Sequence, residues 1–202
     1  MDARQAAENL ELIRTLMERT VQYQLLTARA GLAAGCLAAL GALAFFWLNP
    51  ADPGQFGAVW GMVFAGSFAV TCISTVNRGR ETGEQIWSRQ ARAVLYALAP
   101  SLCAAFALTV FFFARGEHLW LPGVWLLCYG QGALATAAYA PTQITWLGVG
   151  SLAMGIAALV LGPAWAVLMM GLSFGLGHIT LGTALLLAER RQQGLKIHRS
   201  VA

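Results

Sequence analysis

Six long apolar stretches, separated by short polar segments, dominate the pattern of the chain. Each stretch is close to the ~20 residues that an apolar helix needs to cross ~30 Å of hydrocarbon, and none contains Asp, Glu, Lys or Arg. Because several connections are short, consecutive helices must run antiparallel. The pattern predicts an all-α, polytopic membrane protein with six transmembrane helices arranged as three antiparallel hairpins. The predicted spans are residues 30–48, 56–76, 93–114, 119–138, 144–161 and 164–188.

The segment before the first span has an amphipathic pattern instead. Its apolar residues recur at intervals of three and four, which predicts one apolar face of a cytoplasmic helix over residues 1–28. This face, interpreted as partner-facing, contains Leu10, Ile13, Met17 and Val21. The segment is not polybasic, and this favours a protein partner over an anionic lipid surface. Packing of the same face on the protein itself, or at the membrane interface, is the simpler alternative.

Basic residues lie almost entirely on one side of the predicted spans. Of the 13 Lys and Arg residues, only Arg115 falls on the other side. Cytoplasmic loops are enriched in Lys and Arg, so the pattern places both termini in the cytoplasm and the protein in the bacterial inner (plasma) membrane. It also divides the chain into a six-helix bundle over residues 29–189 and a basic cytoplasmic tail over residues 190–202. The three clusters are Arg4, Arg14, Arg19 and Arg29; Arg78, Arg80, Arg89 and Arg92; and Arg190, Arg191, Lys196 and Arg199.

Composition agrees with a membrane protein and excludes several other classes. The chain is 58% hydrophobic and only 11% charged, whereas roughly a quarter of the residues in soluble domains are charged. The net charge of +4 comes from residues that flank apolar spans, so we expect contact with the lipid bilayer and not with nucleic acid. The four cysteines lie one in each of the first four spans, a spacing typical of neither a disulfide framework nor a metal site.

Two local signals refine the ends of the spans. Most tryptophans, including Trp60 and Trp125, lie at or near the ends that we interpret as periplasmic, which predicts rings at the headgroup level. The sequence from Thr82 to Gln85 has the spacing of a capping box, which predicts that the third helix begins there.

His178 is the only histidine within a predicted span, and Gln131 lies at a similar depth in the fourth span. Ionisable residues inside a membrane are costly and must face the bundle interior, so we interpret His178 and Gln131 as a polar intramembrane pair. The simplest role is structural, with a neutral imidazole bonded to Gln131, to a Ser or Thr, or to a carbonyl. The functional alternatives are a proton relay assembled from His178, Gln131, Tyr129 and hydroxyls, and an axial ligand for a haem or chlorin. A second transmembrane histidine is missing, which argues against a bis-histidine haem.

Small residues form ordered faces on three helices. Gly31 and Gly35 have the small-xxx-small spacing, as do Gly57 and Gly61, and the predicted sixth helix carries a third face with Gly171, Gly175 and Gly182. Such faces allow helices to approach closely. They serve either packing within one chain or self-association into an oligomer.

Three stretches resemble an uncharacterised family of bacterial six-span membrane proteins. They are residues 12–19 (LIRTLMER), 125–141 (WLLCYGQGALATAAYAP) and 171–182 (GLSFGLGHITLG). Similar proteins keep a histidine at the position of His178, and some carry another near Ala138, which this chain lacks. The family has no known activity, so the resemblance implies architecture only.

These features allow three functional hypotheses to be ranked. No nucleophile and base pair, phosphate loop or metal cluster is present in the sequence, so we expect no catalytic residues and no enzyme activity. The leading hypothesis is a non-enzymatic membrane subunit that holds or regulates a cytoplasmic or membrane partner, or joins copies of itself. The alternatives are a channel or facilitator for a small or neutral solute, which would use a polar stripe of Gln131, Thr136, His178 and Thr180, and a haem- or chlorin-binding subunit at His178.

Overall fold

The protein is an elongated bundle of helices in the computed structural model, which describes residue 5 and residues 27–83 and 85–201, with side chains as far as Arg191. No strand occurs in this part of the chain. The elements are α2 (Ala28–Ala44), α3 (Pro53–Thr82), α4 (Arg89–Ala114), the 3-10 turn η1 (His118–Trp120), α5 (Leu121–Ala135), α6 (Thr142–Leu161), α7 (Pro163–Met170), the π-helix η2 (Gly171–Gly177) and α8 (His178–Val201). The predicted N-terminal helix, with Leu10, Ile13, Met17 and Val21, lies outside the described residues.

Several of these helices are long and apolar enough to cross a membrane. Four qualify among the described residues: Pro53–Thr82, Arg89–Ala114, Thr142–Leu161 and Pro163–Arg191. The last combines α7, η2 and the first half of α8. The helices α2 and α5 are shorter, with 17 and 15 residues.

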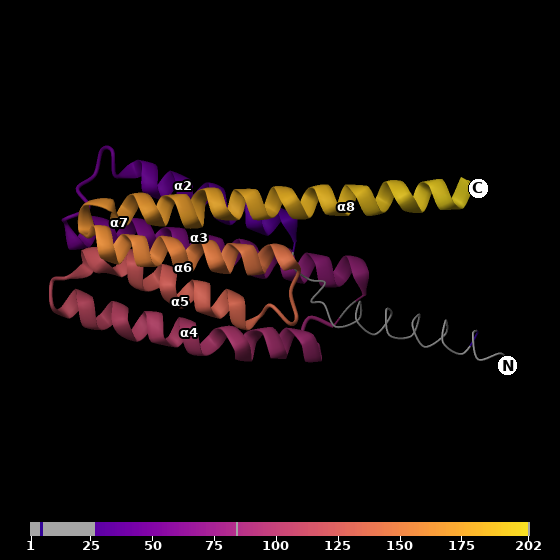
Figure 1. The fold of residues 1–202 in the computed structure, drawn as a ribbon, viewed down its shortest axis with the longest axis horizontal. Helices are drawn as coiled ribbons and strands as arrows, with labels where there is room; N and C mark the ends of the chain where they lie inside the picture. Colours follow the sequence, from indigo (N-terminus) through magenta and orange to yellow (C-terminus); the bar gives the residue numbers. More distant parts are fainter. Residues whose placement is uncertain (1–4, 6–26, 84, 202) are drawn as a thin grey trace.

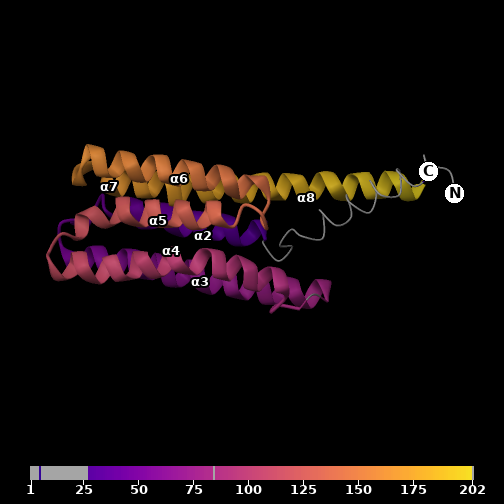
Figure 2. The same cartoon turned by 60° about the horizontal axis from the view of Figure 1, so that its bottom comes forward.

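The helices form two rows that run along the long axis of the molecule (Figures 1 and 2). In one row α4 packs on α5 and α5 on α6, and in the other α3 packs on α2 and α2 on η2 and α8. The rows meet where α6 contacts α7 and η2. Aromatic side chains connect α3 to α4, with ring centroids of Phe64 and Phe106 5.2 Å apart and those of Phe56 and Phe113 6.4 Å apart.

Glycine allows α2 and α8 to meet almost backbone to backbone. A Cβ atom on Gly35 would lie 2.7 Å from the backbone nitrogen of Ile179, and one on Gly182 would lie 2.7 Å from that of Leu32. Gly31 also faces Gly182, and a Cβ atom on Gly31 would lie 3.3 Å from the Cα atom of Gly182. These small-residue faces are therefore occupied by packing within the chain.

The junction between α3 and α4 differs from the sequence prediction. Thr82 is the last residue of α3, which Gly83 ends in the left-handed conformation with φ 71°, so the next helix does not begin at Thr82 as predicted. Ser88 caps α4 instead, since its side chain accepts a hydrogen bond from the backbone N–H of Ala91 at 3.1 Å. At this junction α3 continues past the predicted span of residues 56–76 as far as Thr82, and α4 begins only at Arg89.

Two tryptophans are also placed differently from the prediction. Trp60 is buried in a core cluster that includes Phe56, Leu121 and Met170. Trp125 lies against Phe64 and Phe106, and its indole N–H donates to Thr109 Oγ1 at 2.9 Å. Both rings pack against side chains of neighbouring helices and do not point outward from the bundle.

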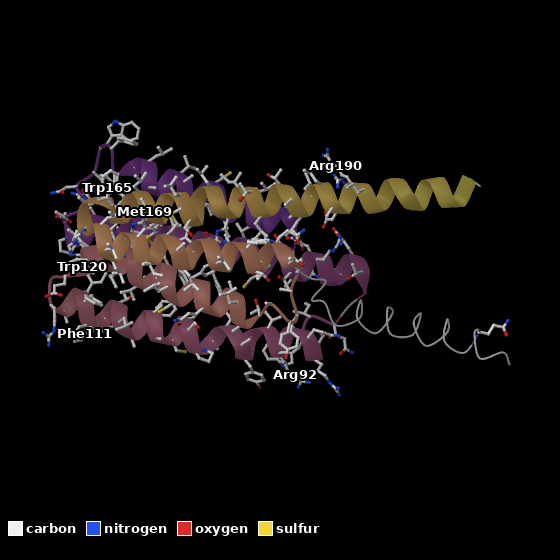
Figure 3. All side chains as sticks on the ribbon, viewed as in Figure 1. Arg92, Phe111, Trp120, Trp165, Met169 and Arg190 are labelled. Carbon is white, nitrogen blue, oxygen red and sulfur yellow. The ribbon has the colours of Figure 1, made fainter. Side chains whose placement is uncertain are left out.

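Charge separates the two ends of the bundle. Arg92 and Arg190 lie toward one end, whereas Phe111, Trp120 and Trp165 lie at the other (Figure 3). We call the first the basic end: it contains the end of α3, the start of α4 and the middle of α8. The predicted basic tail is helical, since α8 continues to Val201. Arg115 lies at the opposite end, with its guanidinium 4.7 Å from the centre of the Phe111 ring.

Candidate functional site: a polar layer inside the bundle

The imidazole of His178 is joined to the phenol of Tyr129 inside the bundle. Tyr129 comes from the middle of α5 and His178 is the first residue of α8, and their Oη and Nε2 atoms are 2.8 Å apart. The bond links the two rows of helices across the interior. Polar side chains that bridge transmembrane helices contribute about 1 kcal/mol or less each, so this pair is a modest but specific tie.

Aromatic packing encloses the same pair. Phe174 lies edge-on to Tyr129, with ring centroids 5.1 Å apart, and 5.9 Å from the ring of His178. The second ring nitrogen of His178, Nδ1, is buried next to the backbone of Ser173 and Phe174, although neither residue meets the geometry of a hydrogen bond to it.

A π-helix immediately precedes His178. The seven residues of η2 include Gly171, Gly175 and Gly177, and glycine tolerates unusual backbone geometry. Such widened turns are rare and occur often at functional sites. The side chains of Phe174, in the middle of η2, and His178, directly after it, both contact the ring of Tyr129. The sequence predicted an ordinary helix here.

Gln131 is not the partner of His178, contrary to the prediction from depth. Its side chain is exposed on the outside of the bundle, two residues beyond Tyr129 on α5. Two residues correspond to about 200° around an α-helix, so Tyr129 and Gln131 point to nearly opposite sides. Gln131 and His178 were predicted at a similar depth, but Gln131 points outward and His178 points toward α5.

A second polar pair lies nearby, between α6 and η2. Ser151 and Ser173 are almost fully buried, and their Oγ atoms are 2.9 Å apart. One hydroxyl therefore donates a hydrogen bond to the other in the apolar interior. With His178 and Tyr129 they form what we call the polar layer, the residues Tyr129, Ser151, Ser173 and His178.

The chain has no match among protein-family models, curated proteins or solved structures. The resemblance to the six-span family stays a prediction.

A haem or chlorin ligand at His178 stays a prediction. Nε2 of His178 is bonded to Tyr129, and Nδ1 is buried. An axial bond through Nε2 would take the place of the bond to Tyr129. Among the described residues, no group of three or more His, Cys, Asp or Glu side chains lies together as metal ligands would.

The polar stripe expected of a pore is also dispersed. Thr136 is buried with its hydroxyl bonded to the carbonyl of Ala133, while Thr180 is exposed with its hydroxyl bonded to the carbonyl of Gly177. Gln131 lies outside the bundle and His178 inside it. These side chains do not share one path through the bundle.

A buried histidine that sequence reasoning did not single out lies at the end opposite the basic end. His118 is 3% exposed, stacks on Phe113 with ring centroids 5.7 Å apart, and its Nε2 lies 3.1 Å from the carbonyl oxygen of Pro50. Because a carbonyl can only accept, Nε2 carries the proton and donates. His118 fastens the loop between α2 and α3 to η1, a structural role that spacing alone did not reveal.

Proposed function

We propose that this chain is a non-enzymatic membrane subunit with six spans, which presents a basic helix to a protein partner on the cytoplasmic side. The two short helices fit this topology. The turn η1 runs directly into α5, giving 18 helical residues from His118 to Ala135, and turns extend α2 by a few residues beyond Ala44. Both then approach the length that crosses ~30 Å of hydrocarbon.

The helical extension of α8 is the observation that carries the proposal. The helix passes the end of the other described helices and continues in the direction of the bundle axis (Figures 1 and 2). Its last ten residues, 192–201, add about 15 Å. Helices of this length gain most of their stability from packing against something else.

Charge and direction indicate what the partner is. From residue 192 onward the chain has Lys196 and Arg199 and no Asp or Glu. A helix that follows the bundle axis leads away from the membrane surface, so its basic residues favour an acidic protein surface over lipid headgroups. The small-residue faces of α2 and α8 are occupied within the chain, which weakens self-association through them.

Removal of the extension tests the proposal. We expect full-length protein, purified in mild detergent from its native membrane, to carry a partner that a variant lacking residues 192–202 loses. Native mass spectrometry would identify the partner and count chains of 21.5 kDa. A matched control is Lys196→Gln with Arg199→Gln, which keeps the helix and should weaken the complex in a salt-dependent way. An unchanged complex after truncation would reject the proposal, and a loss of folded protein would be visible as a changed melting temperature.

A further inference from the structure

A groove of about 360 Å³ runs along the outside of the bundle between α6 and the η2–α8 helix. Gly150 and Gly177 lack side chains in its walls, and the bonded pair Ser151 and Ser173 lies along it. Its volume is within the ~300–1,000 Å³ of ligand sites. Gly150 is exposed, and a Cβ atom there would meet nothing within 4 Å, so the groove is open where it passes this residue.

We propose that this groove binds one acyl chain of an anionic phospholipid from the cytoplasmic leaflet. The walls suit hydrocarbon because they are mostly apolar and their hydroxyls already take part in hydrogen bonds: Ser151 with Ser173, and Thr180 with the carbonyl of Gly177. A polar solute would find few free hydrogen-bond groups there. An acyl chain needs none.

The length of the groove indicates a lipid and not a helix. Its wall on α6 extends from Gln143, at the start of that helix, to Met154. Eleven residues of helix span about 17 Å, close to half of the ~30 Å hydrocarbon core and thus to one leaflet. A transmembrane helix from a second copy would need nearly twice this length.

Charge at the mouth of the groove indicates an anionic headgroup. Gln143 and Trp146 lie at the mouth, and Ala184 is the last lining residue on α8. Arg191 follows Ala184 by seven residues, so it lies two turns, or about 10 Å, further along the same face. Arg191 is exposed and forms no ion pair among the described side chains. An exposed guanidinium at this position suits a phosphate near the membrane surface.

Photo-crosslinking tests the position of the chain. Protein would be reconstituted in nanodiscs with phosphatidylglycerol that carries a diazirine on one acyl chain, and labelled peptides would be identified by mass spectrometry. We expect label concentrated on residues 143–154 and 172–184. Gly150→Leu should abolish this enrichment, because its side chain fills the groove. Gly61→Leu is the matched control, since Gly61 on α3 is equally open and lies outside the groove.

The headgroup is tested separately. Arg191→Gln should lower the preference for phosphatidylglycerol over phosphatidylcholine by about fivefold, the ratio that corresponds to ~1 kcal/mol for one basic residue near the surface. Arg190→Gln, on another face of α8, should keep the preference. If Gly150→Leu fails to fold, Thr180→Leu blocks the same groove from α8.

Three outcomes would overturn the lipid site. One is label spread evenly over all outer helix faces. Another is an equal effect of the Gly150 and Gly61 variants. The third is disulfide crosslinking of two chains through Gly150→Cys in an otherwise cysteine-free protein, which would place a second copy in the groove. None of these depends on the partner proposed for the α8 extension.

Discussion

The hydroxyl of Tyr129 is the hydrogen-bond partner of Nε2 of His178, and one substitution removes it. Tyr129→Phe keeps the ring and its packing on Phe174, but removes the hydrogen-bond partner of Nε2 of His178. We expect the free energy of unfolding in detergent to fall by about 1 kcal/mol, measured as a lower thermal midpoint. Tyr96→Phe is the control, since Tyr96 is 72% exposed and should show no change. An equal response of both variants would contradict the hydrogen bond.

The sequence singled out His178 because no other histidine lies in a span, but its partner could not be predicted. Gln131 was favoured because it lies at a similar depth in the fourth predicted span. Which of Tyr129 and Gln131 faces inward depends on the rotation of α5 against α8, and η2 changes the rotation of α8. Local sequence does not report how far two helices turn relative to each other.

The close contact between α2 and α8 predicts that a larger residue at Gly35 destabilises the helix pair. Gly35→Ala would place a Cβ atom 2.8 Å from the carbonyl oxygen of Gly175 and closer still to the nitrogen of Ile179, so the helices must separate. We expect a loss of about 1–3 kcal/mol in the free energy of unfolding. Gly61→Ala, with open space around it, should be neutral or stabilising by up to ~1 kcal/mol. Thermal unfolding of both variants in the same detergent measures the difference, and equal midpoints would show that the α2–α8 contact can relax.

The bounds of the elements were predictable where the chain carries an unambiguous stop. The expected and observed ends coincide at Ala114, before Arg115, and at Leu161, before Gly162 and its proline. The expected and observed bounds differ where backbone conformation determines the helix end. At Gly83 the left-handed conformation ends α3, and no helix begins at the neighbouring capping sequence. The π-helix η2 was not foreseen either, because its residues are as apolar as those of an ordinary span. Hydropathy reports burial in the membrane and does not distinguish one helical hydrogen-bond pattern from another.

At the scale of the whole molecule, the exposed surface of the bundle is apolar around its waist and basic at one end. Phe68, Val110 and Val160 are each more than 60% exposed, which suits side chains that face lipid. The basic end contains the last turns of α3, the start of α4 and the middle of α8, while Arg115 lies at the other end. This separation supports one orientation, with the basic end in the cytoplasm.

Cysteine accessibility tests both the orientation and the crossing of the two shortest helices, α2 and α5. Single cysteines would replace Arg29, Asn49, Glu117 and Thr142, all exposed and placed at opposite ends of these helices, in a protein whose four native cysteines are alanine. With an impermeant maleimide on intact spheroplasts, we expect labelling at Asn49 and Glu117 alone, and labelling at all four positions after lysis. The lysed sample controls for burial of each site. Equal labelling at Glu117 and Thr142 in intact spheroplasts would mean that α5 does not cross, and labelling restricted to Arg29 and Thr142 would reverse the orientation inferred from charge.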